Sequence, residues 1–189
     1  MMGVAAGRRK KLSLSEVILS ERVVYYEGAA ALASGKVAAR SELPRPGLSI
    51  QQDLNAYFAT GSLPDRLLEH ANRLGFAMPP ESKAGEVAAR LMVSPATIAS
   101  GELLIRDWKL FEGFQGLHGK AIVAEVEAYG VFDACDRQNV LVLVVRDISD
   151  YGDTTKDTKP QPLCPLITPL MDGAEDWLSK LEGSTRLAA

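Results

Sequence analysis

The chain has 189 residues, of which 47% are hydrophobic and 24% are charged, and this composition fits one globular domain with a buried core. A formal net charge of −3 argues against a surface that binds nucleic acid or anionic lipid. Cys135 and Cys164 lie far apart without metal-binding spacing, which argues against a disulfide scaffold or a zinc site and favours a reducing cytoplasm. The longest apolar run, Val140 to Val145, is too short for a membrane span, and we expect no cofactor.

The N-terminal part of the chain begins with a basic run and continues into a strand-forming segment. The run from Arg8 to Lys11 is not followed by the long apolar stretch of a signal peptide, so we expect a disordered basic tail over residues 1–11. Val17 to Tyr26 is rich in β-branched and aromatic residues and predicts one or two strands. Gly28 to Ala39 is alanine-rich, and its composition leaves the secondary structure open.

The middle of the chain has helical periodicity interrupted by one strand. Apolar residues between Ser49 and Leu74 recur at helical spacing and predict two helices separated by Gly61 and Pro64. Ala96 to Gly101 predicts a strand that runs into a tight turn. Leu103 to Phe111 then predicts a helix with apolar residues on one face.

The last third contains the strongest strand signals. Ala121 to Val126 predicts a strand that leads directly into a helix from Glu127 to Cys135, where we expect Gly130 to allow close packing. Asn139 to Val145 is continuous and apolar, which predicts a strand buried on both faces, followed by a polar loop. We assign residues 12–157 to one α/β domain with a mixed sheet, and 158–189 to a proline-rich tail with a short terminal helix.

Three segments place polar residues where the predicted strands end. Their sequences are IASGE from Ile98, AEVEAYGV from Ala124 and VVRDISDYGD from Val144. In α/β folds, ligands bind where strands end. Taken alone, each carboxylate is more often a helix cap or a solvated turn, so the prediction of a site depends on the three segments together.

In this order the three segments resemble the nucleoside phosphorylase/nucleosidase family, which includes methylthioadenosine/S-adenosylhomocysteine nucleosidases and purine and uridine phosphorylases. ASGE is similar to the family's ASGD turn, EVEA to its EMEA strand-to-helix junction, and RDISD to its RxISD strand end. Upstream, LSLSEVILSERVVYYE resembles the family's strand pair. The resemblance covers residues 12–157 and implies a phosphorylase/hydrolase-like mixed sheet or partial barrel flanked by helices.

The resemblance implies cleavage of a nucleoside N-ribosidic bond, through an oxocarbenium-like sugar. Glu127 matches the acid that accepts hydrogen bonds from the ribose hydroxyls, and charge-assisted bonds of this kind are strong. Asp150 matches the general acid that protonates the purine, and Ser149 would orient it. Arg146 matches the basic residue near the nucleophile, which is water or phosphate.

The resemblance also implies an apolar lining for the substrate. Val126 stands where the family usually has a methionine beneath the sugar. Leu104 and Ile105 follow the ASGE turn, where adenine-specific nucleosidases carry an aromatic residue that stacks on the base. We therefore expect substrate contacts from Val126, Leu104 and the backbone of Ile105, without aromatic stacking from this turn. The substrate is left open among purine nucleosides such as methylthioadenosine and S-adenosylhomocysteine.

Family domains begin with a buried strand, an acidic residue that handles the nucleophilic water, and a glycine-rich strand and turn. Only MMGVAAGRRKKL precedes the matching region here, and we expect none of these parts from it. We therefore expect a fragment or a degenerate paralogue that lacks the first strands and is weak or inactive alone. Two functions stay open: a nucleosidase or phosphorylase, and a non-catalytic nucleoside-sensing module. A homodimer is the assembly that the resemblance implies.

Overall fold

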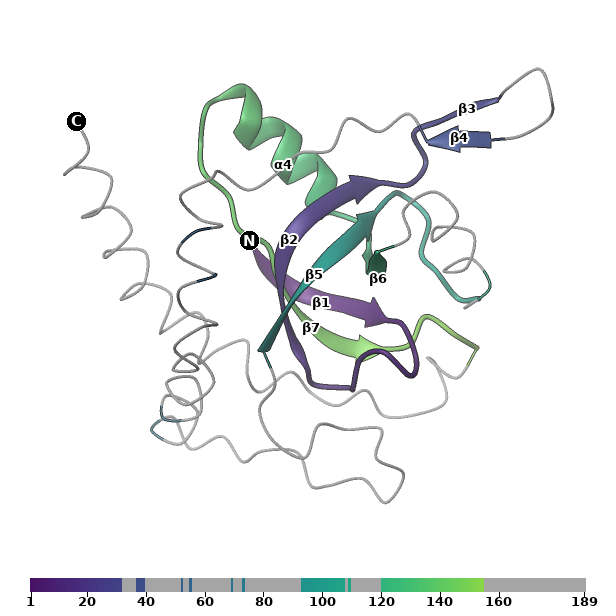
Figure 1. Ribbon diagram of the computed structural model, residues 1–189, viewed down its shortest axis with the longest axis vertical. Helices are drawn as coiled ribbons and strands as arrows, with labels where there is room; N and C mark the ends of the chain where they lie inside the picture. The colour runs from purple at the N-terminus through teal and green to yellow at the C-terminus, as the bar shows by residue number, and fades with distance from the viewer. Residues whose placement is uncertain are drawn as a thin grey trace.

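The computed structural model describes residues 1–31, 37–39, 93–107 and 120–154, together with the single positions 52, 55, 69, 73 and 109. Figure 1 shows the arrangement of the strands and of the helix α4 in these ranges. The elements, in chain order, are β1 (Met2–Gly7), β2 (Val17–Tyr25), β3 (Ala29–Ala31), β4 (Val37–Ala39), β5 (Val93–Ser100), β6 (Ala121–Glu125), α4 (Ala128–Arg137) and β7 (Val145–Asp150).

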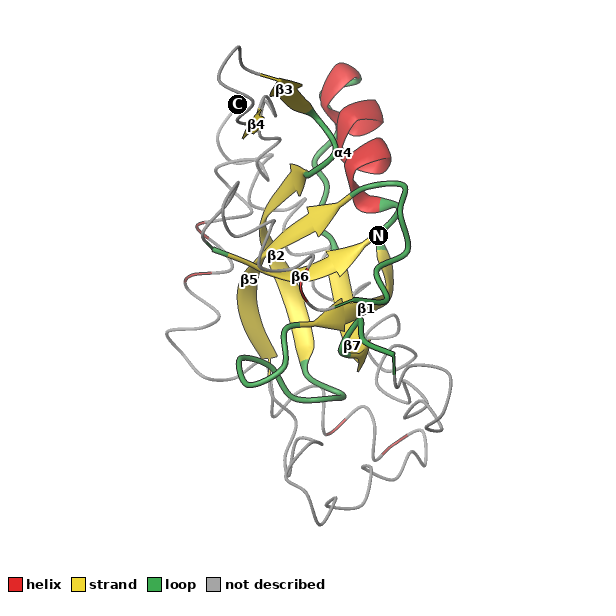
Figure 2. Cartoon of the chain, turned by 90° about the vertical axis from the view of Figure 1, so that its right-hand side faces the viewer, coloured by secondary structure: helices red, strands yellow, loops and turns green. Residues whose placement is uncertain are grey.

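Five of the strands form a closed barrel in the order β1-β6-β5-β2-β7, and β3 and β4 form a separate two-stranded sheet. The barrel is mixed: β5 is parallel to β2 and β6, and β1 is parallel to β7, whereas β1 and β6, like β2 and β7, are antiparallel. The carboxyl ends of β2, β5 and β6 therefore lie at one end of the barrel, where α4 begins. Figure 2 shows α4 at this end. The prediction of an α/β domain with a mixed sheet is confirmed.

Apolar side chains from the strands and from α4 hold the barrel together. Ile18, Val23, Ile98, Val123 and Ile148 are fully buried. They share one core cluster with Phe132, which α4 contributes. Their burial removes apolar surface from water, which is the main favourable contribution to folding.

The N-terminal residues differ from the expected disordered tail, because Met2–Gly7 forms the barrel strand β1. This strand pairs with β7 on one side and with β6 on the other. The basic charges begin only at Arg8, so the small apolar residues before it are free to enter the barrel. The amide N–H of Arg8 still donates to the carbonyl of Ile122 at 2.8 Å. A glycine-containing strand is therefore present where none was expected.

The buried strand near the C-terminal end of the domain is displaced from its predicted position. Val140 and Leu141 are more than half exposed and lie outside any strand, whereas β7 occupies Val145–Asp150. Asn139 adopts a left-handed φ of 53°, and the amide of Val140 closes the end of α4 by donating to the carbonyl of Cys135. The apolar run thus connects the end of α4 to β7, and the polar RDISD segment forms the buried strand.

An expected helix and the expected packing role of a glycine are also corrected. Residues 103–107 are not helical, because Glu27 binds the amides of Glu102 and Leu103 and holds them in a turn. The helix of Ala128–Arg137 agrees with the expected one, but a Cβ on Gly130 would contact nothing within 4 Å, so this glycine does not serve close packing. The two helices expected between Ser49 and Leu74, Trp108 to Phe111, and the tail from residue 158 lie outside the described residues, apart from single helical positions.

Candidate active site

Glu125 organises the junction between β6 and α4. Its side chain is 3% exposed, and its carboxylate accepts the amide N–H groups of Glu127 at 3.0 Å and of Ala128 at 2.9 Å. The first amides of a helix have no partner within the helix, so a carboxylate here satisfies them. Glu127 occupies the N-cap position but makes no side-chain cap hydrogen bond. Glu125 thus performs the capping that would otherwise fall to Glu127.

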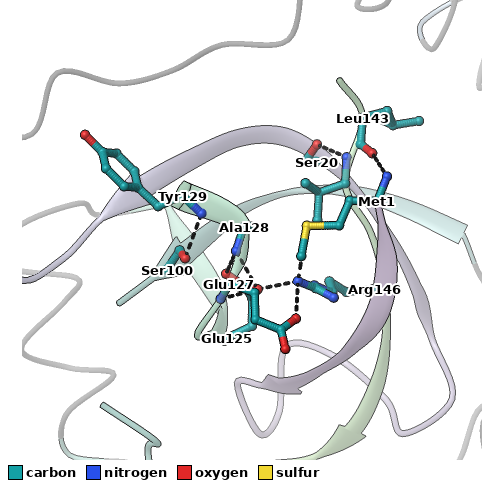
Figure 3. Close-up of polar contacts among 10 residues, drawn as sticks. Met1, Ser20, Ser100, Glu125, Glu127, Ala128, Tyr129, Leu143 and Arg146 are labelled. Carbon is teal, nitrogen blue, oxygen red and sulfur yellow. Dashed lines mark hydrogen bonds and ion pairs between the residues drawn. The ribbon is translucent and has the colours of Figure 1, made fainter. Parts of the chain in front are cut away.

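Arg146 connects this junction to β7. Its side chain is 1% exposed and forms ion pairs with the buried Glu125 and with Oε2 of Glu127, the latter at 3.2 Å. Glu127 is 64% exposed, so the guanidinium lies between a buried and an exposed carboxylate. Figure 3 shows the three side chains converging. The group carries one positive and two negative formal charges.

Gly3 on β1 makes room for this guanidinium. In the parallel pairing of β1 and β7, Gly3 lies opposite Arg146. A Cβ at residue 3 would collide with Nη1 of Arg146. A larger residue at this position would have to displace the buried guanidinium, so the glycine serves a close approach rather than a special backbone conformation.

Asp150 ends β7 and is held by neutral donors. Its side chain is buried, and the hydroxyl of Ser149 donates to Oδ2 at 2.9 Å. The amide of Gly152 donates to Oδ1 at 2.8 Å, in a turn where Gly152 has a φ of 61°. Ser149 also lies 3.4 Å from the carbonyl of Ala5 on β1. Two different donors therefore fix both carboxylate oxygens of Asp150.

The structure brings the predicted site residues together in two groups. Arg146 contacts Glu127 at one end of β7, and Ser149 contacts Asp150 at the other end, about 13 Å further along at the usual rise of about 3.3 Å per residue. The strands β6 and β7 are not neighbours, because β1 lies between them. Ala6 pairs with both Ala124 and Asp150. The strand that the sequence did not predict thus joins the two parts of the site.

The predicted lining residues lie at the carboxyl ends of β5 and β6. Val126 is 41% exposed and Leu104 is 53% exposed, so both side chains are accessible. Ile105 is 5% exposed and packs in a core cluster with Tyr26 and Ala124. Its side chain therefore faces the core, and the substrate contact expected from its backbone stays a prediction.

Glu27 and Tyr26 fix the turn after β5. Oε1 of Glu27 accepts the amides of Glu102 and Leu103, both at 3.0 Å. The hydroxyl of Tyr26 donates to the carbonyl of Leu103 at 2.7 Å. Burial raises the pKa of Tyr26 to about 12, and the negative charge of Glu27 adds to the shift.

Three of these residues were not assigned a role from the sequence: Gly3, Glu27 and Glu125. The signal for Glu125 was present, because it is the first acid of the EVEA motif. Gly3 sits in an apolar segment that looks like a tail, and nothing in the local sequence indicates that Glu27 binds a turn 75 residues away.

Across residues 1–31, 93–107 and 120–154, no group of three or more His, Cys, Asp or Glu side chains could hold a metal ion. Within the ranges that the structure describes, none of the helices has the length and apolar character that a membrane span requires.

No protein-family model matches the chain. In sequence, the chain is 60% identical over 157 residues to a protein of Escherichia coli strain KTE188 named ATP nucleosidase Cap17. This match covers 83% of the chain but only 31% of that protein's length. The chain therefore spans less than a third of the curated relative that it resembles.

Solved nucleosidase structures share the fold. A futalosine hydrolase mutant of Helicobacter pylori strain 26695 superposes with a TM-score of 0.52 and 18% identity, covering 83% of this chain and 57% of that one. A 5′-methylthioadenosine/S-adenosylhomocysteine nucleosidase of Streptococcus pneumoniae, bound to a transition-state inhibitor, gives a TM-score of 0.52 and 12% identity with the same coverage. The resemblance to the nucleoside phosphorylase/nucleosidase family, which the motifs indicate, is therefore confirmed by a relative in sequence and by these structures in fold.

Proposed function

We propose that the chain carries the ribose-binding and proton-donating part of a site that cleaves the N-ribosidic bond of a purine nucleoside or nucleotide. The observation that carries this proposal is the position of Arg146 and Asp150 on one strand. Arg146 is paired with Glu127, and Asp150 lies four residues further on, held by Ser149 and Gly152. One strand thereby positions the groups for both halves of the reaction.

In the proposed reaction the bond between C1′ of the ribose and the purine nitrogen breaks, and its electron pair stays with the base. Asp150 gives a proton to a ring nitrogen, so that the base leaves as a neutral molecule. Glu127 accepts hydrogen bonds from the ribose hydroxyls, which hold the sugar while positive charge develops at C1′. Addition of the nucleophile at C1′ completes the reaction, and the proton that it releases returns to solvent or to the carboxylate of Asp150.

The charge around Arg146 favours water over phosphate as the nucleophile. Arg146 is matched by two carboxylates, Glu125 and Glu127, which leaves the group with a net formal charge of −1. A phosphate dianion beside such a group would be repelled, whereas neutral water would not. The proposal is therefore a hydrolytic nucleosidase, with phosphorolysis as the alternative that the assay below distinguishes.

Adenine compounds are the first substrates to test. The relative that is 60% identical is named an ATP nucleosidase, and one structural neighbour is named a methylthioadenosine/S-adenosylhomocysteine nucleosidase. Those names describe the relatives, and they make ATP and methylthioadenosine the substrates of choice here. A homodimer in a reducing cytoplasm is part of the same proposal, and size-exclusion chromatography tests the assembly.

The deciding experiment measures release of free adenine from ATP and from methylthioadenosine by the purified chain, with and without phosphate. We expect slow release of adenine, together with a sugar product that carries a hydroxyl at C1′, in the absence of phosphate, because the sequence predicts weak activity for the chain alone. A requirement for phosphate, with a ribose 1-phosphate as product, would replace hydrolysis by phosphorolysis. Thermal stabilisation by either compound without release of adenine would instead support a non-catalytic nucleoside-sensing module.

A further inference from the structure

We propose that Glu125 is a positioning residue for ribose recognition, acting through Arg146 and the start of α4 on Glu127. The inference builds on the proposed function, because it concerns how the candidate ribose-binding carboxylate is held. Glu125 is 3% exposed, so it acts through its neighbours rather than on a substrate.

The start of α4 is capped by Glu125 rather than by its N-cap residue. At most N-termini the N-cap side chain binds an amide of the first turn. Here Glu125 binds the amides of both Glu127 and Ala128, and the N-cap residue Glu127 makes no such bond. The carboxylate of Glu127 is therefore released from the helix. At the same time its backbone is fixed by the residue two positions before it.

The buried guanidinium of Arg146 also depends on Glu125. Arg146 is 1% exposed, and a charge buried to this extent requires a partner. Glu125 supplies a buried carboxylate as this partner. Nη2 of Arg146, which contacts Glu125, also contacts Oε2 of Glu127. Among the contacts of the described residues, Oε1 of Glu127 is not engaged. Glu125 thus holds Arg146, Arg146 holds one oxygen of Glu127, and the other oxygen faces the ribose hydroxyls.

The sharpest test compares a ribonucleotide with its 2′-deoxy counterpart. If Glu127 accepts hydrogen bonds from the ribose hydroxyls, the wild-type chain has a higher kcat/KM for ATP than for 2′-deoxy-ATP. The Glu127→Gln variant then loses this preference. Glu125→Gln keeps the shape and one acceptor oxygen but removes the charge that holds Arg146. We expect it to lower the ratio of kcat/KM between the two substrates by about tenfold, mainly through KM for ATP.

A matched variant controls for the loss of a carboxylate. Glu21→Gln makes the same change at an exposed position of β2, and we expect the ratio of the two substrates to stay unchanged. Glu125→Asp keeps the charge on a shorter side chain and should recover part of the preference. An equal loss for both substrates in Glu125→Gln would indicate a merely structural role and would overturn the inference.

A crystal structure separates this inference from the proposed function. If the wild-type chain cleaves neither substrate, the proposed function fails. The position of Glu127 in the Glu125→Gln variant then still shows whether Glu125 positions Glu127. We expect the contact between Arg146 and Glu127 to be lost and the first turn of α4 to shift. An unchanged contact would refute the role of Glu125.

Discussion

The two ends of β7 hold a carboxylate in different ways. At the Arg146 end the contacts are ion pairs, in which a buried guanidinium contacts the buried Glu125 and the exposed Glu127. At the Asp150 end, the contacts with Ser149 and Gly152 come from a neutral hydroxyl and a neutral amide. The same chemical group is therefore held by a guanidinium at one end and by a hydroxyl and an amide N–H at the other.

This difference matches the two tasks of the proposed reaction. A carboxylate beside a guanidinium is suited to accepting hydrogen bonds from sugar hydroxyls, because the charged form is stabilised by its partner. A buried carboxyl that a hydroxyl and an amide N–H orient suits a group that must give up a proton and take it back, which is the task proposed for Asp150. The predictions below test whether the two ends of β7 are separable in this way.

The largest expected effect is on catalysis at the Asp150 end. Asp150→Asn keeps the side-chain shape but removes the proton donor, so we expect release of adenine to fall about 10²- to 10⁴-fold while substrate binding changes little. Asp153→Asn is the control, because Asp153 pairs with the partly exposed Arg9 in the following turn. Retention of full activity in Asp150→Asn would remove the general acid from the proposal.

The next effect concerns stability at the Arg146 end. Arg146→Met leaves the buried Glu125 without its cation, and we expect the free energy of unfolding to fall by about 3–5 kcal/mol. Glu127→Gln acts on the exposed partner of the same guanidinium and should cost less than about 1 kcal/mol. Denaturant unfolding followed by circular dichroism measures both. Equal losses would contradict the view that the buried carboxylate anchors the group.

A smaller effect is expected from replacing either of two glycines by alanine, and the two changes in the free energy of unfolding should have opposite signs. Gly3→Ala inserts a methyl group against the Arg146 guanidinium and should destabilise the barrel by about 1–3 kcal/mol. Gly130→Ala, in α4 with open space around it, should stabilise the fold by about 0.5–1 kcal/mol through better helix propensity. Thermal unfolding of the two variants shows whether each substitution raises or lowers Tm. A neutral Gly3→Ala would mean that the guanidinium can move aside at little cost.

Much of the fold follows from local sequence patterns, and the failures have physical causes. Val17–Tyr25 and Ala121–Glu125 are strands as predicted, because their β-branched and apolar residues suit a half-buried pleated surface. Periodicity failed at β7, because a strand with Arg146 and Asp150 in it does not look apolar. Arg146 is buried because Glu125 and Glu127 from the junction of β6 and α4 bind it, and no local pattern records such partners.

The site shows the same division between local and long-range information. The EVEA and RDISD motifs identify Glu127 and Asp150 as candidates from their residue types and order. The role of β1 could not be read in this way, since MMGVAAG becomes a strand only by pairing with β6 and β7 on both sides. The contact of Gly3 with Arg146 joins positions that are 143 residues apart in the sequence, and only the closed barrel brings them together.

The smallest effect concerns Tyr26, beside the carboxylates of the Arg146 end. Its pKa is raised from 10.0 to about 12 by burial first and by Glu27 second, with a smaller contribution from Glu125. The unfolded chain loses this proton near pH 10, whereas the folded chain keeps it, so the stabilisation is complete below about pH 10 and is lost as the pH rises toward about 12. Tyr26→Phe should remove this part of the pH dependence of unfolding, and the difference in phenolate absorbance between the two proteins should titrate near the raised value. A Tyr26 that titrates at its ordinary pKa would mean that the turn held by Glu27 is open to water.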